Sequence, residues 1–169
     1  SRLRHLPDPR QLGSHNPGAS NMLRLGSRSL ALATLLGDLS KGLLAVWLAR
    51  QAELPLSQQG WVGLAAVCGH VLPIYHGLQG GKGVATAAGV MLILAWPAAL
   101  LAALIWALTF YWQRIASLAS LLASLSLLPW LAWQTPELLL PISLMVSLIL
   151  LRHRVNIGRL LNGQENRFE

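Results

Sequence analysis

A glycine-rich run in the middle of the chain has the residue types that bind a phosphate group. Residues 77–86 read GLQGGKGVAT and lead into an apolar segment. Glycines expose consecutive backbone N–H groups, a helix N-terminus adds partial positive charge, and a lysine adds a full charge. A Walker A loop requires Ser or Thr after the lysine, so a nucleotide-hydrolysing motor is disfavoured. The alternative is a flexible loop with one basic anchor. The sequence predicts an anion site made by Lys82 and the backbone of Gly80, Gly81, Gly83 and Val84.

A second polar cluster lies near the beginning of the chain. Residues 13–21 read GSHNPGASN, and Arg24 follows three residues later. The cluster offers hydroxyl, amide and guanidinium groups, and its glycines let the backbone approach a ligand closely. The alternative is a polar turn in which Ser20 or Asn21 caps the next helix. The hydroxyl, amide and guanidinium groups of this cluster belong to Ser14, Asn16, Ser20, Asn21 and Arg24.

A third cluster follows the last apolar segment. Residues 152–166 read RHRVNIGRLLNGQEN. In a helix, His153 and Asn156 share a face at a spacing of three, with Arg152 beside them. The alternative is a basic tail that binds lipid headgroups.

Single polar residues inside the apolar segments give weaker signals. Asp38 and Lys41 are three residues apart, which predicts an ion pair within a membrane helix. His70 is either a hydrogen-bonded interior histidine or a functional one. The histidines show neither HxxxH nor HExxH spacing, so no metal site is expected. Cys68 is the single cysteine, which excludes a disulfide within the chain.

The composition indicates the class of protein that holds these clusters. Of 169 residues, 54% are apolar and 11% are charged, which is too apolar a composition for a soluble domain of this size. The formal net charge is +7, but the basic residues lie between apolar segments rather than in a stripe beside aromatic residues. The sequence therefore predicts an integral membrane protein and no nucleic-acid partner.

The apolar segments predict the topology. They cover about 29–49, 61–76, 84–112, 115–133 and 137–151. A spanning helix needs about 20 apolar residues, so 84–112 is one overlong kinked helix or two short helices that meet near Pro97. With two crossings, 11 of the 13 Lys and Arg residues lie on one side of the membrane, and the positive-inside rule favours this arrangement. We expect a single domain over residues 1–169: an all-α, polytopic membrane helix bundle of about six transmembrane segments, its basic side cytoplasmic.

The clusters, taken together, resemble the PlsY family of bacterial acyl-phosphate:glycerol-3-phosphate acyltransferases. The matching motifs are GSHNPGASNMLR at 13–24, GDLSKG at 37–42, GHVLPIYHGLQGGKGVAT at 69–86, ASLAS at 116–120 and RHRVNIGRLLNGQEN at 152–166. The resemblance implies a seven-helix bundle in the bacterial inner membrane with a cytoplasmic active site, and a first helix that this chain lacks. His15 stands where the family commonly has Gly, and Ser20 where Thr is usual.

The resemblance also implies a reaction. The 1-hydroxyl of glycerol 3-phosphate attacks the carbonyl of a long-chain acyl phosphate and gives 1-acyl-glycerol 3-phosphate (lysophosphatidic acid) and phosphate, without a cofactor. An acyl phosphate is already activated, so it needs alignment and charge neutralisation more than a protein nucleophile. The sequence agrees, since it has no G-x-S-x-G motif. An upstream enzyme that forms the acyl phosphate is a candidate partner, and membrane lipid surrounds the site.

The family's site residues carry over by motif. The resemblance implies that glycerol 3-phosphate is bound and oriented by Ser14, Arg24, Lys82, His153 and Asn156, of which Lys82, His153 and Ser14 are the catalytic candidates. The N–H groups from Gly80 to Val84 would hold the acyl-phosphate phosphoryl group, with support from Ser20, Asn21 and Ser117. The base is either His153 or a phosphate oxygen of the substrate. The competing hypotheses are a small transporter of a phosphorylated anion and a non-catalytic, truncated paralogue.

Overall fold

A computed structural model describes residues 12–13, 16–74 and 80–168, and these residues form helices without a strand among them. The elements are α1 (Ala19–Arg24), α2 (Arg28–Gln51), α3 (Leu56–Val71), α4 (Val84–Leu94), α5 (Trp96–Gln113), α6 (Ala116–Gln134), the 3₁₀-helix η3 (Pro136–Leu138), α7 (Leu139–Arg152) and α8 (Arg154–Leu161). The predicted all-α fold is confirmed.

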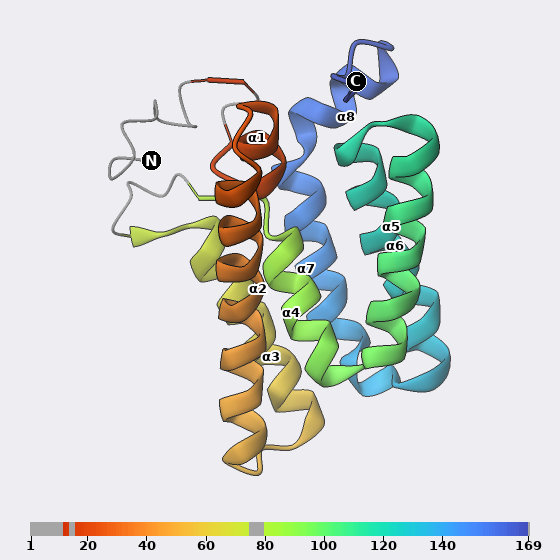
Figure 1. Cartoon of the computed structure of the whole chain (residues 1–169). Coiled ribbons are helices and arrows are strands. Elements are labelled where there is room, and N and C mark those ends of the chain that lie inside the picture. Colours follow the sequence, from red (N-terminus) through yellow and green to blue (C-terminus); the bar gives the residue numbers. More distant parts are fainter. Residues whose placement is uncertain (1–11, 14–15, 75–79, 169) are drawn as a thin grey trace.

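The helices pack side by side in an elongated bundle (Figure 1). The connections α2–α3, α4–α5 and α6–α7 lie at the lower end, whereas α1, α8 and the α5–α6 turn lie at the upper end. The short α4 begins part-way down the bundle, between α2 and α7. The three polar clusters therefore gather at one end, as the distribution of basic residues predicts.

The segment 84–112 is two antiparallel helices and not one kinked helix. The chain reverses at Ala95, whose backbone is extended (φ −153°, ψ 72°), and Pro97 lies in the first turn of α5. Proline is tolerated there because the first N–H groups of a helix have no intrahelical partner. The two helices are unequal in length, with 11 residues in α4 and 18 in α5.

Helix length separates the apolar helices into two groups. Among the described residues, α2, α5 and α6 are long and apolar enough to cross a membrane, and the bent pair of η3–α7 with α8 is a fourth candidate. By contrast, α3 has 16 residues and α4 has 11. The six predicted segments are all present as helices, α2 to α7, but α3 and α4 are shorter than a full span. The predicted segment 61–76 ends early, at Val71, because Pro73 follows and cannot continue the helix.

Two glycines bring α2 and α4 into backbone contact. A Cβ atom on Gly42 of α2 would collide with the carbonyl oxygen of Thr86, and one on Gly89 of α4 would collide with that of Leu39. Small residues at such crossings let membrane helices pack closely. This contact fixes the beginning of α4 against the middle of α2, where Asp38 lies. Below it, buried side chains of α2, α3, α4, α6 and α7 form the core, among them Val46, Val67, Val90, Leu131 and Met145.

Candidate functional site

A polar cavity of about 160 Å³ lies at the end of the bundle where the clusters meet. Its walls come from α1, α2, α3, α4, α5, α6, α8 and the segments before α1, before α4 and after α8. The predicted residues that line it are Ser20, Arg24, Lys82, Gly83, Val84, Ser117, His153 and Asn156. Segments more than one hundred residues apart in the sequence thus contribute to one site.

Four helices begin at this cavity. The N-cap residues of α1, α4, α6 and α8 are Gly18, Gly83, Ile115 and His153, and none makes a side-chain capping bond. Helix N-termini carry unpaired N–H groups and partial positive charge, so their convergence favours an anion. Gly83 adopts a left-handed backbone (φ +89°), and a Cβ atom there would lie 2.9 Å from Val67 Cγ1. A glycine is therefore required to start α4 in this direction.

Lys82 belongs to a chain of hydrogen bonds that joins the glycine-rich run to the third cluster and includes Ser117 of α6. Lys82 Nζ donates to Asn156 Oδ1 (2.6 Å), and Asn156 Nδ2 donates to Glu165 Oε1 (2.8 Å). Ser117 Oγ donates to the same carboxylate oxygen at 3.0 Å. The other oxygen, Oε2, is buried and has no hydrogen-bond partner in the described part of the chain. The network orders the lysine and the amide around the cavity.

The charge of Lys82 is adjusted by its surroundings. Burial lowers the pKa of its ammonium group from 10.5 to about 8, the Glu165 carboxylate raises it, and the guanidinium groups of Arg24, Arg159 and Arg152 lower it. Lys82 is therefore mainly protonated at pH 7 and loses its proton in mildly alkaline solution. Arg152 contributes to the same loop, because its Nη2 donates to the carbonyl oxygen of Gly80 (3.1 Å).

His153 lies at the junction of α7 and α8, where the helix axes bend by 63°. Its side chain is buried, and its Nδ1 is 2.8 Å from the carbonyl oxygen of Ile149. A carbonyl oxygen accepts hydrogen bonds, so Nδ1 carries the proton and Nε2 carries a lone pair. Burial, followed by the nearby charge of Lys82, lowers the pKa of His153 to about 4. At neutral pH the ring is an uncharged hydrogen-bond acceptor.

Three of the predicted residues that the structure describes do not line this cavity: Asn21, Gly80 and Gly81. Ser14 lies outside the described residues. Asn21 is buried in α1 and its Nδ2 donates to the carbonyl oxygen of Leu12, so neither it nor Ser20 is the N-cap. The N–H of Gly80 donates to Val71 O (3.2 Å), and a Cβ atom on Gly81 would collide with His70 Nε2. The cavity is lined from Lys82 onward, into the first turn of α4, where Ala85 also lines it.

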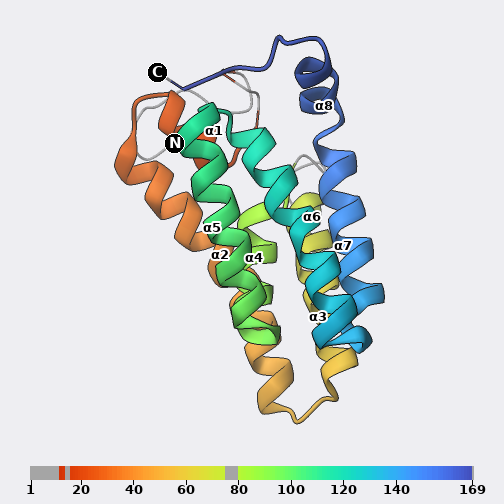
Figure 2. The same cartoon turned by 90° about the vertical axis from the view of Figure 1, so that its right-hand side faces the viewer.

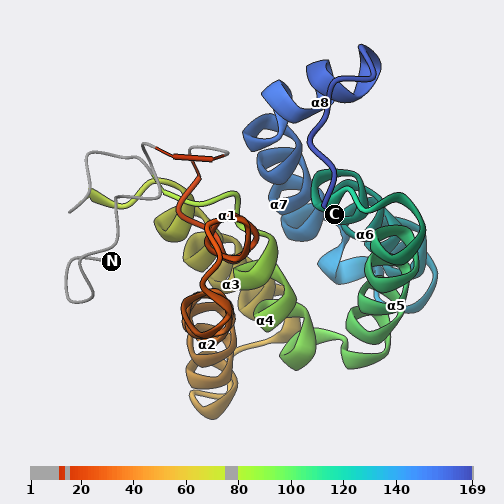
Figure 3. The same cartoon turned by 45° about the horizontal axis from the view of Figure 1, so that its top comes forward.

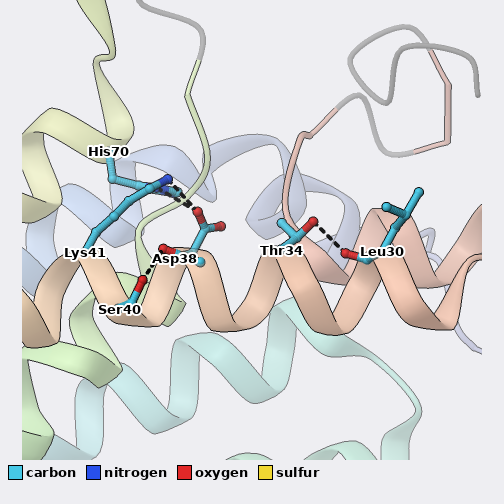
Figure 4. A network of polar contacts seen from close by, with 7 residues as sticks. Leu30, Thr34, Asp38, Ser40, Lys41 and His70 are labelled. Atoms are coloured by element: carbon cyan, nitrogen blue, oxygen red, sulfur yellow. Dashed lines mark hydrogen bonds and ion pairs between the residues drawn. The ribbon is translucent and has the colours of Figure 1, made fainter. Parts of the chain in front are cut away.

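The sequence did not single out two acidic residues of the cavity as site residues. Glu165 lies in the third motif, but its place opposite Lys82 depends on the segment after α8 turning back over the bundle. Asp38 lines the cavity from α2. Its Oδ1 accepts from Lys41 Nζ at 2.8 Å and lies 3.4 Å from His70 Nδ1 (Figure 4). The predicted Asp38–Lys41 pair is confirmed, and His70 also lines the cavity.

A second cavity, of about 300 Å³, adjoins the polar one. It lies between α2, α4, α5 and α6, and its walls are almost entirely alkyl side chains, including Ala87, Met91, Ala99, Ala102, Ala123 and Leu127. Leu35, Val84 and Trp106 line both cavities. Trp106 Nε1 donates to Ser120 Oγ (3.1 Å), which holds the indole ring between the two. The arrangement suits a ligand with an anionic head and an apolar chain.

These features define a membrane helix bundle with a polar cavity that adjoins an apolar one. The family model for glycerol-3-phosphate acyltransferase matches residues 1–163. Curated proteins named glycerol-3-phosphate acyltransferase are similar to the chain: one from Pseudomonas putida strain GB-1 is 57% identical and one from Pseudomonas fluorescens strain Pf-5 is 58% identical. Each alignment spans 168 residues, 99% of this chain and 89% of the relative.

Two solved structures of PlsY (YgiH), an integral membrane glycerol 3-phosphate acyltransferase, have the same fold. The glycerol 3-phosphate form is 36% identical with a TM-score of 0.93 and covers 99% of this chain and 85% of that chain. The lysophosphatidic acid form is 37% identical with a TM-score of 0.87, and the match covers 93% of this chain and 82% of that chain. The chain belongs to the glycerol-3-phosphate acyltransferase family. The resemblance and the acyltransferase activity expected from the sequence are confirmed, and neither transport nor a non-catalytic role finds support here.

Proposed function

We propose that the acyl donor is a long-chain acyl phosphate and that the acceptor is the 1-hydroxyl of glycerol 3-phosphate. The observation that carries this proposal is the junction of the two cavities at Leu35, Val84 and Trp106. An acyl phosphate has a phosphate head, one apolar chain and a reactive carbonyl between them. A donor with its head in the polar cavity and its chain in the apolar one has its carbonyl carbon at this junction.

The beginning of α4 is suited to the donor's phosphoryl group. Val84 and Ala85 line the cavity in the first turn of α4, and no side chain caps that turn. Unpaired N–H groups at a helix N-terminus bind phosphate oxygens and stabilise the charge that grows on the leaving phosphate. Lys82 stands directly before this turn and supplies the full positive charge.

Arg24, Lys82 and Asn156 are suited to hold glycerol 3-phosphate. Arg24 lines the cavity from α1, and the hydrogen-bonded pair of Lys82 and Asn156 lines the same cavity. A guanidinium group can bind two phosphate oxygens at once and thereby fix the orientation of the phosphate. Ser20 and Ser117 add hydroxyl groups to the same walls, and the expectation for Ser14 remains a prediction.

The proton leaves with the substrate phosphate in this scheme. As the hydroxyl oxygen bonds to the carbonyl carbon, the bond from that carbon to the phosphate oxygen breaks, and phosphate departs with the electron pair. His153 Nε2 can accept a hydrogen bond from the attacking hydroxyl and orient it. With a pKa of about 4, however, the His153 ring is a weak base, whereas phosphate protonates near pH 6. A phosphate oxygen of the substrate is therefore the favoured proton acceptor.

We also infer the setting of the enzyme. The polar end carries most of the basic residues, so the positive-inside rule favours a cytoplasmic active site in the bacterial inner membrane. Acyl phosphates are reactive mixed anhydrides, which favours supply from an enzyme that forms them at the same membrane.

The experiment uses purified protein in lipid vesicles with palmitoyl phosphate and glycerol 3-phosphate. We expect phosphate release that depends on glycerol 3-phosphate and matches the amount of lysophosphatidic acid formed. Palmitoyl-CoA in place of palmitoyl phosphate is the matched donor control, and it should give no product. Product from palmitoyl-CoA at a similar rate would contradict the proposed donor.

A further inference from the structure

The last described residues form a strap over the polar end of the bundle. We use the term C-terminal strap for residues 164–168, which follow α8 and have no regular secondary structure. The strap leaves α8 and returns across the end of the bundle toward α1 and α5 (Figures 2 and 3).

The strap contacts Arg24 in two ways. Arg24 Nη2 donates to the carbonyl oxygen of Asn166 at 3.1 Å. The guanidinium carbon of Arg24 lies 4.5 Å from the centre of the Phe168 ring, over its face. A guanidinium group over an aromatic face is held by the electron density of the ring, and the hydrogen bond to Asn166 restricts it further. These two contacts restrict the long side chain of Arg24, which is the last residue of the six-residue helix α1.

Phe168 is itself fixed on the other side. Its backbone N–H donates to the carbonyl oxygen of Arg114 at 2.8 Å, in the turn between α5 and α6. Its ring meets Phe110 edge-on with centroids 5.3 Å apart, and Phe110 stacks on Trp106 at 5.0 Å. The position of the strap is therefore set by α5, whose Trp106 lines both cavities.

We propose that Phe168 is a positioning residue that holds the Arg24 guanidinium in the polar cavity, ready to bind the phosphate of glycerol 3-phosphate. The proposal rests on the function proposed above, in which Arg24 binds that phosphate. Without the ring, the Arg24 side chain samples more rotamers and must be ordered when the substrate binds, which weakens binding. The backbone contact to Asn166 remains, so the effect is a loss of affinity and not of chemistry.

The experiment compares Phe168→Leu with the unchanged protein in lipid vesicles. Leucine keeps apolar volume but has no aromatic face. We expect KM for glycerol 3-phosphate to rise about threefold to tenfold, the range of a partly buried cation–π contact. The kcat value and KM for palmitoyl phosphate should change by less than about twofold on the same argument. Phe168→Tyr retains the ring and should restore KM for glycerol 3-phosphate.

A matched control and a double variant separate positioning from general stability. Tyr111 is an exposed aromatic residue next to Phe110 on α5, and Tyr111→Leu should leave the kinetics unchanged. In the double variant, Arg24→Gln with Phe168→Leu should have the same KM for glycerol 3-phosphate as Arg24→Gln, because the ring acts through Arg24. Additive effects of the two substitutions would overturn the proposal.

The remaining outcomes distinguish the positioning role of Phe168 from the substrate-binding role of Arg24. If Arg24→Gln raises KM for glycerol 3-phosphate but Phe168→Leu does not, the positioning role is wrong and the proposed function stands. If Arg24→Gln leaves that KM unchanged, Arg24 does not bind the substrate, and both assignments are wrong. A loss of kcat and of thermal stability in Phe168→Leu, without a specific change in KM, would assign the ring a structural role and overturn the proposal.

Discussion

The two adjoining cavities are built in different ways. The polar cavity is formed at the ends of helices, by backbone groups and by side chains from five or more elements that are distant in sequence. The apolar cavity is formed by the sides of four helices and owes its space to small residues, mainly alanines. A change in the polar cavity should therefore remove a function, whereas a change in the apolar cavity should alter the length of chain that fits.

The largest effect is expected for Lys82→Ala in the polar cavity. The substitution removes a buried charge and leaves Asn156 Oδ1 without its donor. Loss of such a charge at an acyl-transfer centre, where it stabilises the departing phosphate, costs on the order of 100-fold to 1,000-fold in kcat/KM. Phosphate release from palmitoyl phosphate in the presence of glycerol 3-phosphate measures it. Near-normal turnover would show that Lys82 does not serve the substrates.

Gly83→Ala should have the next largest effect, because it changes the backbone that forms part of the polar cavity. Alanine at φ +89° is strained by about 1–3 kcal/mol, and its Cβ atom would press on Val67. We expect weaker substrate binding and a lower unfolding temperature, measured by kinetics and by thermal unfolding in detergent. The matched control is Gly158→Ala in α8, where a Cβ atom meets no neighbour within 4 Å. Equal behaviour of the two variants would mean that the start of α4 tolerates a side chain.

Ala99→Leu tests whether the apolar cavity holds the acyl chain. Ala99 is 8% exposed and lines the cavity, so leucine takes up space that an acyl chain would use. Each excluded methylene is worth about 0.8 kcal/mol, so the preference for palmitoyl over lauroyl phosphate should fall about tenfold. KM for glycerol 3-phosphate should stay the same. The control is Ala65→Leu, at an exposed position on α3. An unchanged chain preference in Ala99→Leu would contradict the assignment of this cavity.

These contrasts also explain what the sequence predicts well. Lys82, His153 and Asn156 stand out because charged and amide groups are rare in an apolar chain, and the structure brings all three to one cavity. Pro97 and the distribution of basic residues predict that 84–112 is two helices. A proline affects the helix at its own position, and the Lys and Arg residues on each side of the membrane can be counted from the sequence. Glu165 was not predicted as a site residue, because its position depends on the path of the strap.

The backbone N–H donors are harder to predict from the sequence than the side chains. The glycine run suggests the N–H groups of Gly80 and Gly81, but these glycines pack against the end of α3. Their small size serves this close packing, whereas the unpaired N–H groups belong to the first turn of α4. A glycine pattern indicates that the backbone comes close to something, without telling whether that is a ligand or a neighbouring helix.

The pH dependence gives a smaller and graded test of the polar cavity. Since the pKa of Lys82 is lowered to about 8, the ammonium group is charged below that pH and loses its proton above it. Binding of glycerol 3-phosphate should weaken as pH rises through about 8, by up to about tenfold for each further pH unit. Titration calorimetry from pH 7 to pH 9.5 measures this. Affinity that is constant over this range would contradict a role for the Lys82 charge.

Cys68→Ala should have the smallest effect. Cys68 lies on α3 and, within the described residues, is not among those that line either cavity. Acyl transfer as proposed needs no thiol, so kcat and both KM values should be unchanged. A large loss of activity would indicate that a thioester forms during turnover.

The most direct test of the account is whether one donor must fill both cavities. The measurement compares kcat/KM for palmitoyl phosphate and for acetyl phosphate, at saturating glycerol 3-phosphate, in the same lipid vesicles. Acetyl phosphate has the head and the carbonyl but no chain, so it lacks the binding free energy of the apolar cavity. We predict that palmitoyl phosphate is used at least about 1,000-fold more efficiently, from a few kcal/mol of buried chain. Similar efficiency for the two donors would contradict the claim that the adjoining cavities bind one amphiphilic substrate.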